Sequence, residues 1–563
     1  MLTVDRKVRL GELLVTHGVI DNAQLERVIQ HQKKSGEKIG QALISLGFIT
    51  EKQFLDFFSQ HLNISFYDLR FFKIDEKLAR ELPESYARLY RAIILKKQDN
   101  GLLIGMVDPL DVIAIDKLRG ILKQPLFFAL VKKQDLENVF TLIYRHTKAI
   151  SGFAEALSAE INKDIAAEIT ANPVDAPVVD LLNTIFRDAA QMNASDVHIE
   201  PSEKTIRIRL RIDGMLHEQI VKEPSIMPAI VSRLKLMSGL NISEKRMPQD
   251  GRFEMHSENK KFDVRLSTMP TPFGESVVLR LLPQTQGHVQ LNDIGMSGDL
   301  LIKMRELFHK PNGIILVTGP TGSGKSTTLY AAINEINRPV IKIITIEDPI
   351  EYFLSFATQI QANEKIGLNF ATILRGILRH DPDVILLGEM RDNETSSIAM
   401  RTALTGRLVL STLHTNDAIS AVYRLIDLGI ESYMIASTTQ AILAQRLVRL
   451  ICDHCKEDYI LNEHEKTWLT KLNFHIDLMT FKMGRGCTLC SNTGFHGRTG
   501  IFELLEFDEA MSESLRKNDQ DAFHRQATQA LLGKKLLNDA YRLVKNGVTT
   551  VSEMIRVINE GYV

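Results

Sequence analysis

The sequence lacks the features that mark secreted, membrane-spanning and general nucleic-acid-binding proteins. It has four cysteines and one tryptophan in 563 residues, and its net charge is −1. A charge near zero does not support general nucleic-acid binding, although a local basic patch remains open. No apolar run approaches the roughly 18 residues of a membrane span, and residues 1–12 lack a signal-peptide core. We therefore expect a cytoplasmic chain that meets a membrane only through a partner.

The chain is long enough for several domains of ordinary globular composition. Its length suggests about three to four domains, and 44% hydrophobic with 24% charged residues is typical of packed cores. We expect an N-terminal domain at 1–145, a linker at 146–172, a second N-terminal α/β domain at 173–285 and a nucleotide-binding domain at 286–563. A cysteine-containing module at about 450–495 is inserted in the last of these.

The four cysteines form two pairs, Cys452 with Cys455 and Cys487 with Cys490. In a reducing compartment, two such pairs predict a tetrahedral Zn²⁺ site, because each pair supplies two thiolates from one tight turn. The 31 residues between the pairs exceed the commonest zinc-ribbon spacing, and free core thiols or disulfides remain alternatives. Four sulfur ligands leave no open coordination position, so the predicted role of the metal is structural.

A phosphate-binding loop is the strongest motif in the chain. An apolar run at 313–318 precedes it and a helix-forming stretch at 328–333 follows it, which disfavours a chance match by a Gly-rich turn. The loop amides and the helix N-terminus would face the phosphates of ATP, Lys325 would reach the β- and γ-phosphates, and Ser326 would ligate Mg²⁺. The motif consists of Gly319, Pro320, Thr321, Gly322, Ser323, Gly324, Lys325, Ser326 and Thr327.

Three further apolar stretches each end in a candidate catalytic residue: Glu347, Glu389 and His414. The carboxyl ends of parallel strands open onto one ligand crevice, so these side chains are predicted to converge on Lys325. One acid can serve Mg²⁺, another can orient the attacking water, and the histidine can sense the γ-phosphate. The alternatives are carboxylates that only cap helices and a histidine with a structural role.

Alternating apolar and basic residues at 205–214 predict a strand with one buried face and its arginines, including Arg209 and Arg211, on the other. Two more predicted strands, at 262–267 and 277–282, carry Arg265 and Arg280. On the pattern alone, alternating arginines are most often a solvated face.

An internal repeat occupies the N-terminus. Residues 9–32 align with residues 38–61 at an offset of 29, and each copy predicts a short helix, a glycine turn and a second helix. Asp21 and Thr50 are expected to cap the second helices.

Together these motifs resemble the secretion ATPases that power type II secretion and type IV pili. The stretches at Lys325, Glu347, Glu389 and His414 resemble that family's Walker A, Asp box, Walker B and His box. Residues 195–201 and 209–214 resemble the signature of its second N-terminal domain, and the cysteine pairs resemble the zinc module of its assembly branch. The resemblance covers the whole chain.

This resemblance implies an α/β multidomain protein. It would have a RecA-like P-loop ATPase core, a preceding PAS-like α/β domain, a zinc-binding subdomain and a helical-repeat N-terminal domain. It also implies a homo-hexamer that works with an inner-membrane platform protein. Glu347 would orient the water, Glu389 would support the metal through its hydration shell, and the arginines of the second domain would complete the ATP site: Arg209, Arg211, Arg265 and Arg280.

The N-terminal repeat resembles the tandem cyclic di-GMP-binding motif of mannose-sensitive haemagglutinin pilus ATPases. The second copy departs from the motif at its end, where His61 stands in place of Gln. A pair of helical hairpins for protein docking is the alternative. The implied ligand residues are Arg9, Leu10, Gly11, Leu14, Gly18, Leu25, Ile29, Gln32, Lys38, Ile39, Gly40, Leu43, Gly47, Phe54, Phe58 and His61.

The favoured function is thus ATP-driven type IV pilus assembly, regulated by cyclic di-GMP. A type II secretion ATPase shares every motor motif and is the closest alternative. A nucleotide-gated cyclic di-GMP receptor that acts as a scaffold is a rival of another class, and the intact Lys325, Glu347 and Glu389 disfavour it.

Overall fold

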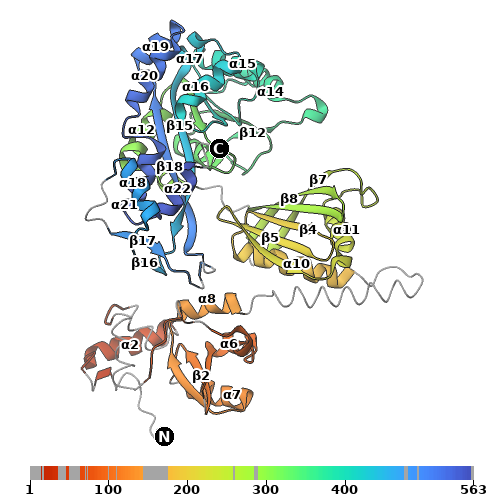
Figure 1. The fold of residues 1–563 in the computed structure, drawn as a ribbon, viewed down its shortest axis with the longest axis vertical. Coiled ribbons are helices and arrows are strands. Elements are labelled where there is room, and N and C mark those ends of the chain that lie inside the picture. The colour runs from red at the N-terminus through yellow and green to blue at the C-terminus, as the bar shows by residue number, and fades with distance from the viewer. Residues whose placement is uncertain are drawn as a thin grey trace. The chain divides into compact units, whose positions relative to one another are not determined.

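Two compact units divide the chain, residues 1–145 with 486–492, and residues 146–485 with 493–563. The architecture is that of a computed structural model (Figure 1). It describes residues 14–15, 18–35, 43, 46–49, 64–69, 72, 74–98, 100–109, 111–143, 175–257, 260–283, 289–474, 480–487, 489–490 and 493–559.

The apolar runs around the phosphate loop form the centre of a seven-stranded sheet. Its order is β12-β11-β13-β14-β10-β15-β18, and every neighbouring pair is parallel except the antiparallel β15–β18 pair. Strands β10, β11, β13 and β14 are buried along their whole length, as expected of parallel strands covered by helices on both faces. The strands are β10 (Gly313–Thr318), β11 (Ile343–Glu347), β12 (Thr358–Gln361), β13 (Val384–Leu387), β14 (Leu408–Leu413), β15 (Thr439–Ile451) and β18 (Phe495–Glu506).

Hydrophobic cores lie on both faces of this sheet. Along β10, Ile314 and Leu316 belong to one core and Ile315 and Val317 to the other, because successive side chains of a strand point to opposite faces. Helices α14 to α16 contribute to the first core, and α12 and α13 contribute to the second. The helices are α12 (Gly298–Phe308), α13 (Lys325–Ile336), α14 (Phe370–Ile377), α15 (Asn393–Leu404), α16 (Ala418–Asp427), α17 (Ser432–Thr438), α18 (Glu463–Lys471), α19 (Glu509–Arg516), α20 (Gln520–Ala530), α21 (Leu536–Lys545) and α22 (Val551–Asn559).

A six-stranded antiparallel sheet precedes the nucleotide-binding region, in the order β6-β5-β4-β9-β8-β7. Helices α10 (Asp175–Gln191) and α11 (Met227–Met237) pack on one face, where they share a core with the apolar side chains of the strands (Figure 1). The arginine-bearing strands predicted from the sequence are β5, β8 and β9. The strands are β4 (Asp196–Pro201), β5 (Ile206–Ile212), β6 (Met215–Val221), β7 (Gln249–Ser257), β8 (Lys260–Thr271) and β9 (Gly274–Pro283).

The smaller unit has its own core around a three-stranded sheet of order β1-β2-β3. Strands β1 and β2 are antiparallel, and β2 and β3 are parallel. The elements are α2 (Asn22–Ser35), α5 (Glu76–Ala79), α6 (Glu84–Tyr90), β1 (Ala92–Gln98), β2 (Gly101–Met106), α7 (Val112–Leu122), β3 (Leu126–Leu130) and α8 (Lys133–Ile143).

The two copies of the N-terminal repeat make the same turn. Gly18 and Gly47 have φ values of 70° and 71°, a left-handed conformation that glycine adopts at no steric cost. In each copy the amide after the glycine donates to the carbonyl five residues before that amide: Val19 to Leu14 at 2.9 Å, and Phe48 to Leu43 at 3.1 Å. Leu14 and Leu43 are both fully buried in one cluster. Asp21 caps α2 as predicted, whereas Thr50 lies outside the described residues.

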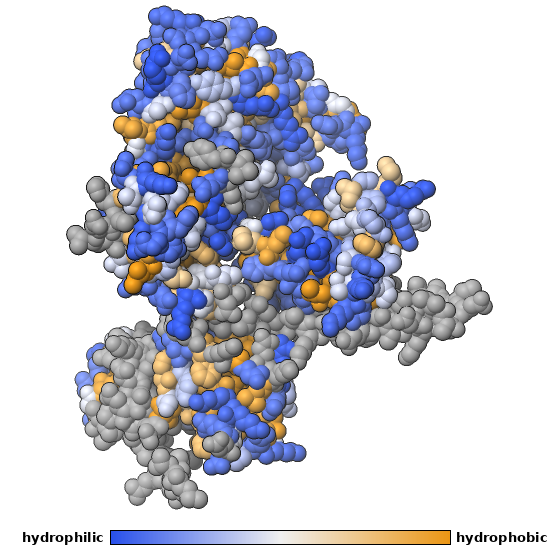
Figure 2. Space-filling model, in the orientation of Figure 1, coloured by the Kyte–Doolittle hydropathy of each residue, from blue (hydrophilic) through white to orange (hydrophobic). Residues whose placement is uncertain are grey.

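Hydrophilic residues predominate on the visible face of the larger unit (Figure 2). Among the helices that the structure describes, none combines the length and the apolar character that crossing a bilayer requires.

Candidate functional site

The phosphate loop connects the end of β10 at Thr318 to the start of α13 at Lys325. Gly322 and Gly324 have φ values of 80° and 87°, which strain any other residue type. A Cβ atom on Gly319 would lie 2.4 Å from the carbonyl oxygen of Gln445. The glycines therefore allow the backbone to curl tightly before the helix, which leaves a helix N-terminus suited to a phosphate.

Lys325 lies folded against this loop. Its Nζ donates to the carbonyl of Gly319 at 2.8 Å and to that of Pro320 at 3.1 Å. Burial lowers the pKa of Lys325 to about 8, although the nearby Glu389 carboxylate opposes the shift. The ammonium is thus largely charged at neutral pH but poorly solvated. The negative charge of a bound polyphosphate would therefore stabilise it.

Glu389 and His414 continue from Lys325 as a line of polar contacts. Lys325 Nζ lies 3.4 Å from His414 Nδ1, and His414 Nε2 lies 3.3 Å from Glu389 Oε2. Burial and then the Lys325 charge lower the pKa of His414. Burial alone would raise the pKa of Glu389, but the hydrogen-bonded Arg391 and His414 bring it below its ordinary value. Near neutral pH the line therefore consists of a cation, a neutral imidazole and a carboxylate, which can respond to a γ-phosphate.

Glu347 is not part of this line. Its side chain is 4% exposed, and it accepts hydrogen bonds from Tyr330, Thr345 and Gln359. The predicted convergence of four side chains thus involves three of them, because strand β11 directs the Glu347 carboxylate towards α13 and β12. The acid that sequence reasoning passed over is Glu351, whose side chain is 32% exposed.

Gln445 on β15 is a second residue that sequence reasoning missed. Its Nε2 donates to the carbonyl of Ser323 at 2.9 Å, and its Oε1 accepts from Thr328 Oγ1 at 2.6 Å. One buried amide therefore fixes both ends of the turn from the phosphate loop into α13. A glutamine directly after the apolar run at 441–444 was the available signal, because a buried polar side chain needs partners.

Among the four predicted arginines, all of which the structure describes, Arg265 is the one that contacts the loop after β11. Its Nη2 lies 3.2 Å from the Ile350 carbonyl and 3.2 Å from Glu351 Oε2. Arg211 and Arg280 both pair with Asp196 on β4, at 3.7 and 3.0 Å. The fourth arginine, Arg209, pairs with the Glu200 carboxylate. Geometry thus ranks the arginines, which the alternating pattern did not.

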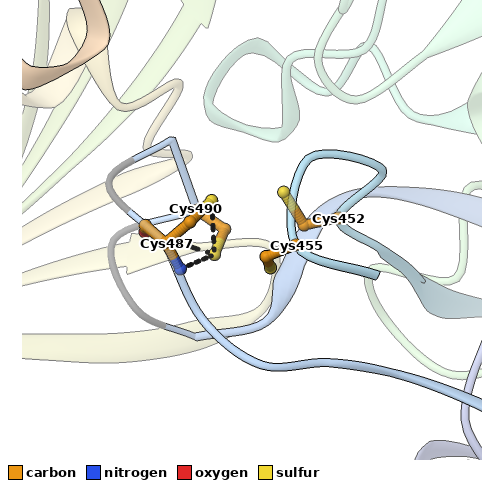
Figure 3. A group of neighbouring side chains, drawn as sticks. All are labelled: Cys452, Cys455, Cys487 and Cys490. Atoms are coloured by element: carbon orange, nitrogen blue, oxygen red, sulfur yellow. Dashed lines mark hydrogen bonds between the residues drawn. The ribbon is translucent and has the colours of Figure 1, made fainter. Parts of the chain in front are cut away.

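The four cysteines meet as two facing pairs (Figure 3). All four are buried and unoxidised, and their Sγ atoms lie within 4.8 Å of one another. The Sγ atoms of Cys487 and Cys490 are 3.7 Å apart, too far for a disulfide. Zn–S bonds of about 2.3 Å in a tetrahedron place sulfurs about 3.8 Å apart. The donor set and its spacing therefore fit Zn²⁺.

The residues expected to bind cyclic di-GMP are only partly described. Leu14 and Leu43 are buried in the shared cluster, whereas Ile29 on α2 is 37% exposed. Gly18 and Gly47 form the matching turns, and Leu25 and Gln32 are half-buried on α2. Nine of the expected residues lie outside the described residues: Arg9, Leu10, Gly11, Lys38, Ile39, Gly40, Phe54, Phe58 and His61.

Two family models match the sequence. The model described as type II/IV secretion system protein covers residues 172–556, and the model of the MshEN domain covers residues 62–150. The MshEN match begins after the tandem repeat, so it does not include the residues expected to bind the ligand.

Two curated relatives are also similar. The type IV pilus assembly ATPase PilB of Myxococcus xanthus is 36% identical over 97% of this chain and 98% of its own. The type II secretion system protein E of Pseudomonas aeruginosa is 46% identical over 69% of this chain and 76% of its own.

Among solved structures, the ATPase DotB of Yersinia pseudotuberculosis is similar in fold. The match has a TM-score of 0.51 and 22% identity, and covers 68% of this chain and 94% of DotB. The prediction of an α/β protein with a RecA-like secretion ATPase core is confirmed.

Proposed function

The chain belongs to the type II/IV secretion system protein family and is an ATPase, and from that premise we propose that it powers type IV pilus assembly. It would act as a cytoplasmic homo-hexamer that extracts and polymerises pilin through an inner-membrane platform protein. The observation that carries this proposal is the near full-length similarity to a pilus assembly ATPase in a chain that also has an MshEN domain.

In the proposed reaction the chain binds Mg-ATP at residues 319–327. Lys325 would leave the loop carbonyls for the β- and γ-phosphates, and Ser326 would hold Mg²⁺, which neutralises phosphate charge when bound. Glu389 would orient the water molecules around the metal. His414 would contact the γ-phosphate and so couple it to Glu389. These roles follow from the short distances among Lys325, His414 and Glu389.

We assign the orientation of the attacking water to Glu351 instead of Glu347. The oxygens of Glu347 already accept protein hydrogen bonds, whereas Glu351 is partly exposed and lies beside Arg265. Arg265 is therefore the first candidate among the arginines to complete the ATP site, ahead of Arg209, Arg211 and Arg280. The hypothesis predicts that Glu351→Gln abolishes steady-state ATPase activity.

We further propose that cyclic di-GMP binds the N-terminal repeat and regulates the motor. Two matching glycine turns on one core offer two similar half-sites to a ligand with two phosphates and two purines. Calorimetry of the full chain with cyclic di-GMP tests this proposal. The absence of binding by a folded chain would leave protein docking as the better interpretation of the repeat.

Type II secretion is the second candidate, favoured by the 46% identity to a secretion protein over the motor region. A deletion strain complemented with the wild-type chain or with Lys325→Ala separates the two functions. The proposal expects that only the wild type restores surface pili and that secretion is unaffected by the deletion. Lost secretion with intact pili would support the alternative.

A further inference from the structure

A buried hydrogen-bond network surrounds Glu347 at the end of β11. Its Oε2 accepts from the Tyr330 hydroxyl, and its Oε1 accepts from Thr345 Oγ1 at 2.6 Å and from Gln359 Nε2 at 3.2 Å. A carboxylate that activates water needs an oxygen that faces the water. In Glu347 both oxygens face protein donors instead.

Tyr330 connects this network to the phosphate-loop helix. It stands on α13, five residues after Lys325, and is 4% exposed. Burial and then the charge of Glu347 raise the pKa of Tyr330 far above its ordinary value, so its hydroxyl remains a donor. The same hydroxyl accepts from the Tyr352 amide at 3.4 Å, and the two rings meet edge to face with centroids 5.6 Å apart.

Gln359 connects the network to the loop that follows β11. Besides Glu347, its Nε2 donates to the Tyr352 carbonyl at 2.9 Å, and its Oε1 accepts from the Leu354 amide at 2.7 Å. Gln359 thus fixes the Tyr352 carbonyl and the Leu354 amide, and the Tyr330 hydroxyl fixes the Tyr352 amide. Tyr352 directly follows Glu351, so the network determines where the Glu351 backbone stands.

We propose that Glu347 is a positioning residue, which ties α13 to the loop carrying Glu351 and so aligns Glu351 with the phosphate site. A shift of α13 when nucleotide binds would reach this loop through Tyr330 and Glu347. The inference rests on the proposed function in one respect, the assignment of the attacking water to Glu351.

Kinetic analysis of point variants tests the role of Glu347. Glu347→Gln keeps an acceptor for Tyr330 but has no basic carboxylate, so we expect kcat within about ten-fold of wild type. Glu347→Ala loses the three hydrogen bonds that the carboxylate accepts, and we expect kcat to fall about 100-fold with KM for ATP changed far less. Tyr330→Phe should reduce kcat about ten-fold. Combined with Glu347→Ala it should add little, because both changes remove the same bond.

The control for the tyrosine is Tyr433→Phe, which alters a side chain that is 52% exposed on α17 and should leave kcat unchanged. A catalytic base would give another pattern. Glu347→Gln would then be as inactive as Glu347→Ala, at about 10²–10⁴-fold below wild type, while Tyr330→Phe stayed at the wild-type rate. That result would overturn the proposal.

Hydrogen–deuterium exchange of residues 350–358, measured without ATP hydrolysis, tests whether Glu347 and Tyr330 hold this loop in place. The Tyr352 and Leu354 amides should exchange faster in Tyr330→Phe and Glu347→Ala than in wild type and in Lys325→Ala. Unchanged exchange in both network variants would overturn the proposal even if the kinetics agreed. By contrast, wild-type turnover in Glu351→Gln would overturn the assignment of the water to Glu351, and wild-type turnover in Lys325→Ala would overturn the proposed nucleotide site.

Discussion

Burial of the charged Lys325 side chain lowers the free energy of unfolding of the protein. The folded-state pKa of Lys325, about 8, lies below the ordinary value of 10.5, so folding disfavours the charged form. This penalty is fully present below pH 8 and fades as the pH rises towards 10.5. The shift corresponds to about 3 kcal/mol at most, reduced by whatever the Lys325 hydrogen bonds contribute.

We therefore predict that Lys325→Met abolishes ATPase activity yet raises the free energy of unfolding by about 1–3 kcal/mol at pH 7. The gain should shrink between pH 8 and pH 10. Urea denaturation without nucleotide, at several pH values, measures this difference. The control is the exposed Lys342→Met, which should change neither quantity. A less stable Lys325→Met protein at pH 7 would contradict the electrostatic argument.

Gln445 should matter to nucleotide binding although it lies on β15, outside the phosphate-loop motif at 319–327. Gln445→Leu leaves the Ser323 carbonyl and the Thr328 hydroxyl without their partner, and an unpaired buried polar group costs about 1–3 kcal/mol. We expect ATP affinity to fall about ten- to 100-fold, as measured by titration with a fluorescent ATP analogue. Gln440→Leu, which alters a less buried glutamine of the same strand, should bind normally. Wild-type affinity of Gln445→Leu would refute the role.

Sequence reasoning anticipated the neighbours Lys325, Glu389 and His414, because parallel strands bring their carboxyl ends to one edge. It misplaced Glu347 because the partners that hold this carboxylate, Tyr330 and Gln359, come from separate elements and belong to no motif. The contact of Arg265 with Glu351 likewise depends on tertiary packing, which the alternation of residues along a strand cannot predict.

At the scale of elements, the central strands and the helix after the phosphate loop were predictable from apolar runs and glycine placement. The sheet order was not, since β15 joins the centre from more than 100 residues after β10. Nor was the antiparallel pairing of β16 (Lys456–Tyr459) with β17 (Phe481–Gly484), because these strands lie between the two cysteine pairs and α18 separates them in the sequence.

The module formed by these cysteines should contain one Zn²⁺ per chain, measured by elemental analysis of the purified protein. Cys452→Ser and Cys487→Ser should each lose the metal, because three thiolates and a hydroxyl bind it less well. Chelation should lower the thermal midpoint of the wild type only. Purified wild-type protein without zinc would contradict this prediction.

At the scale of the whole molecule, the two units have separate hydrophobic cores. Calorimetry should therefore resolve two unfolding transitions instead of one. Mg-ATP should raise the midpoint of one transition and cyclic di-GMP the midpoint of the other, because each ligand stabilises the unit that binds it. A single transition shifted by both ligands would show that the units unfold together.

The duplicated glycine turns have a consequence for how a signal would be received. Leu14 and Leu43 come from different copies yet pack in one cluster, so neither turn has a core of its own. The two copies should consequently unfold as one cooperative unit. Both half-sites of the receptor would then be folded together or unfolded together. A dose–response curve for the second messenger should then follow a single step without a half-occupied plateau.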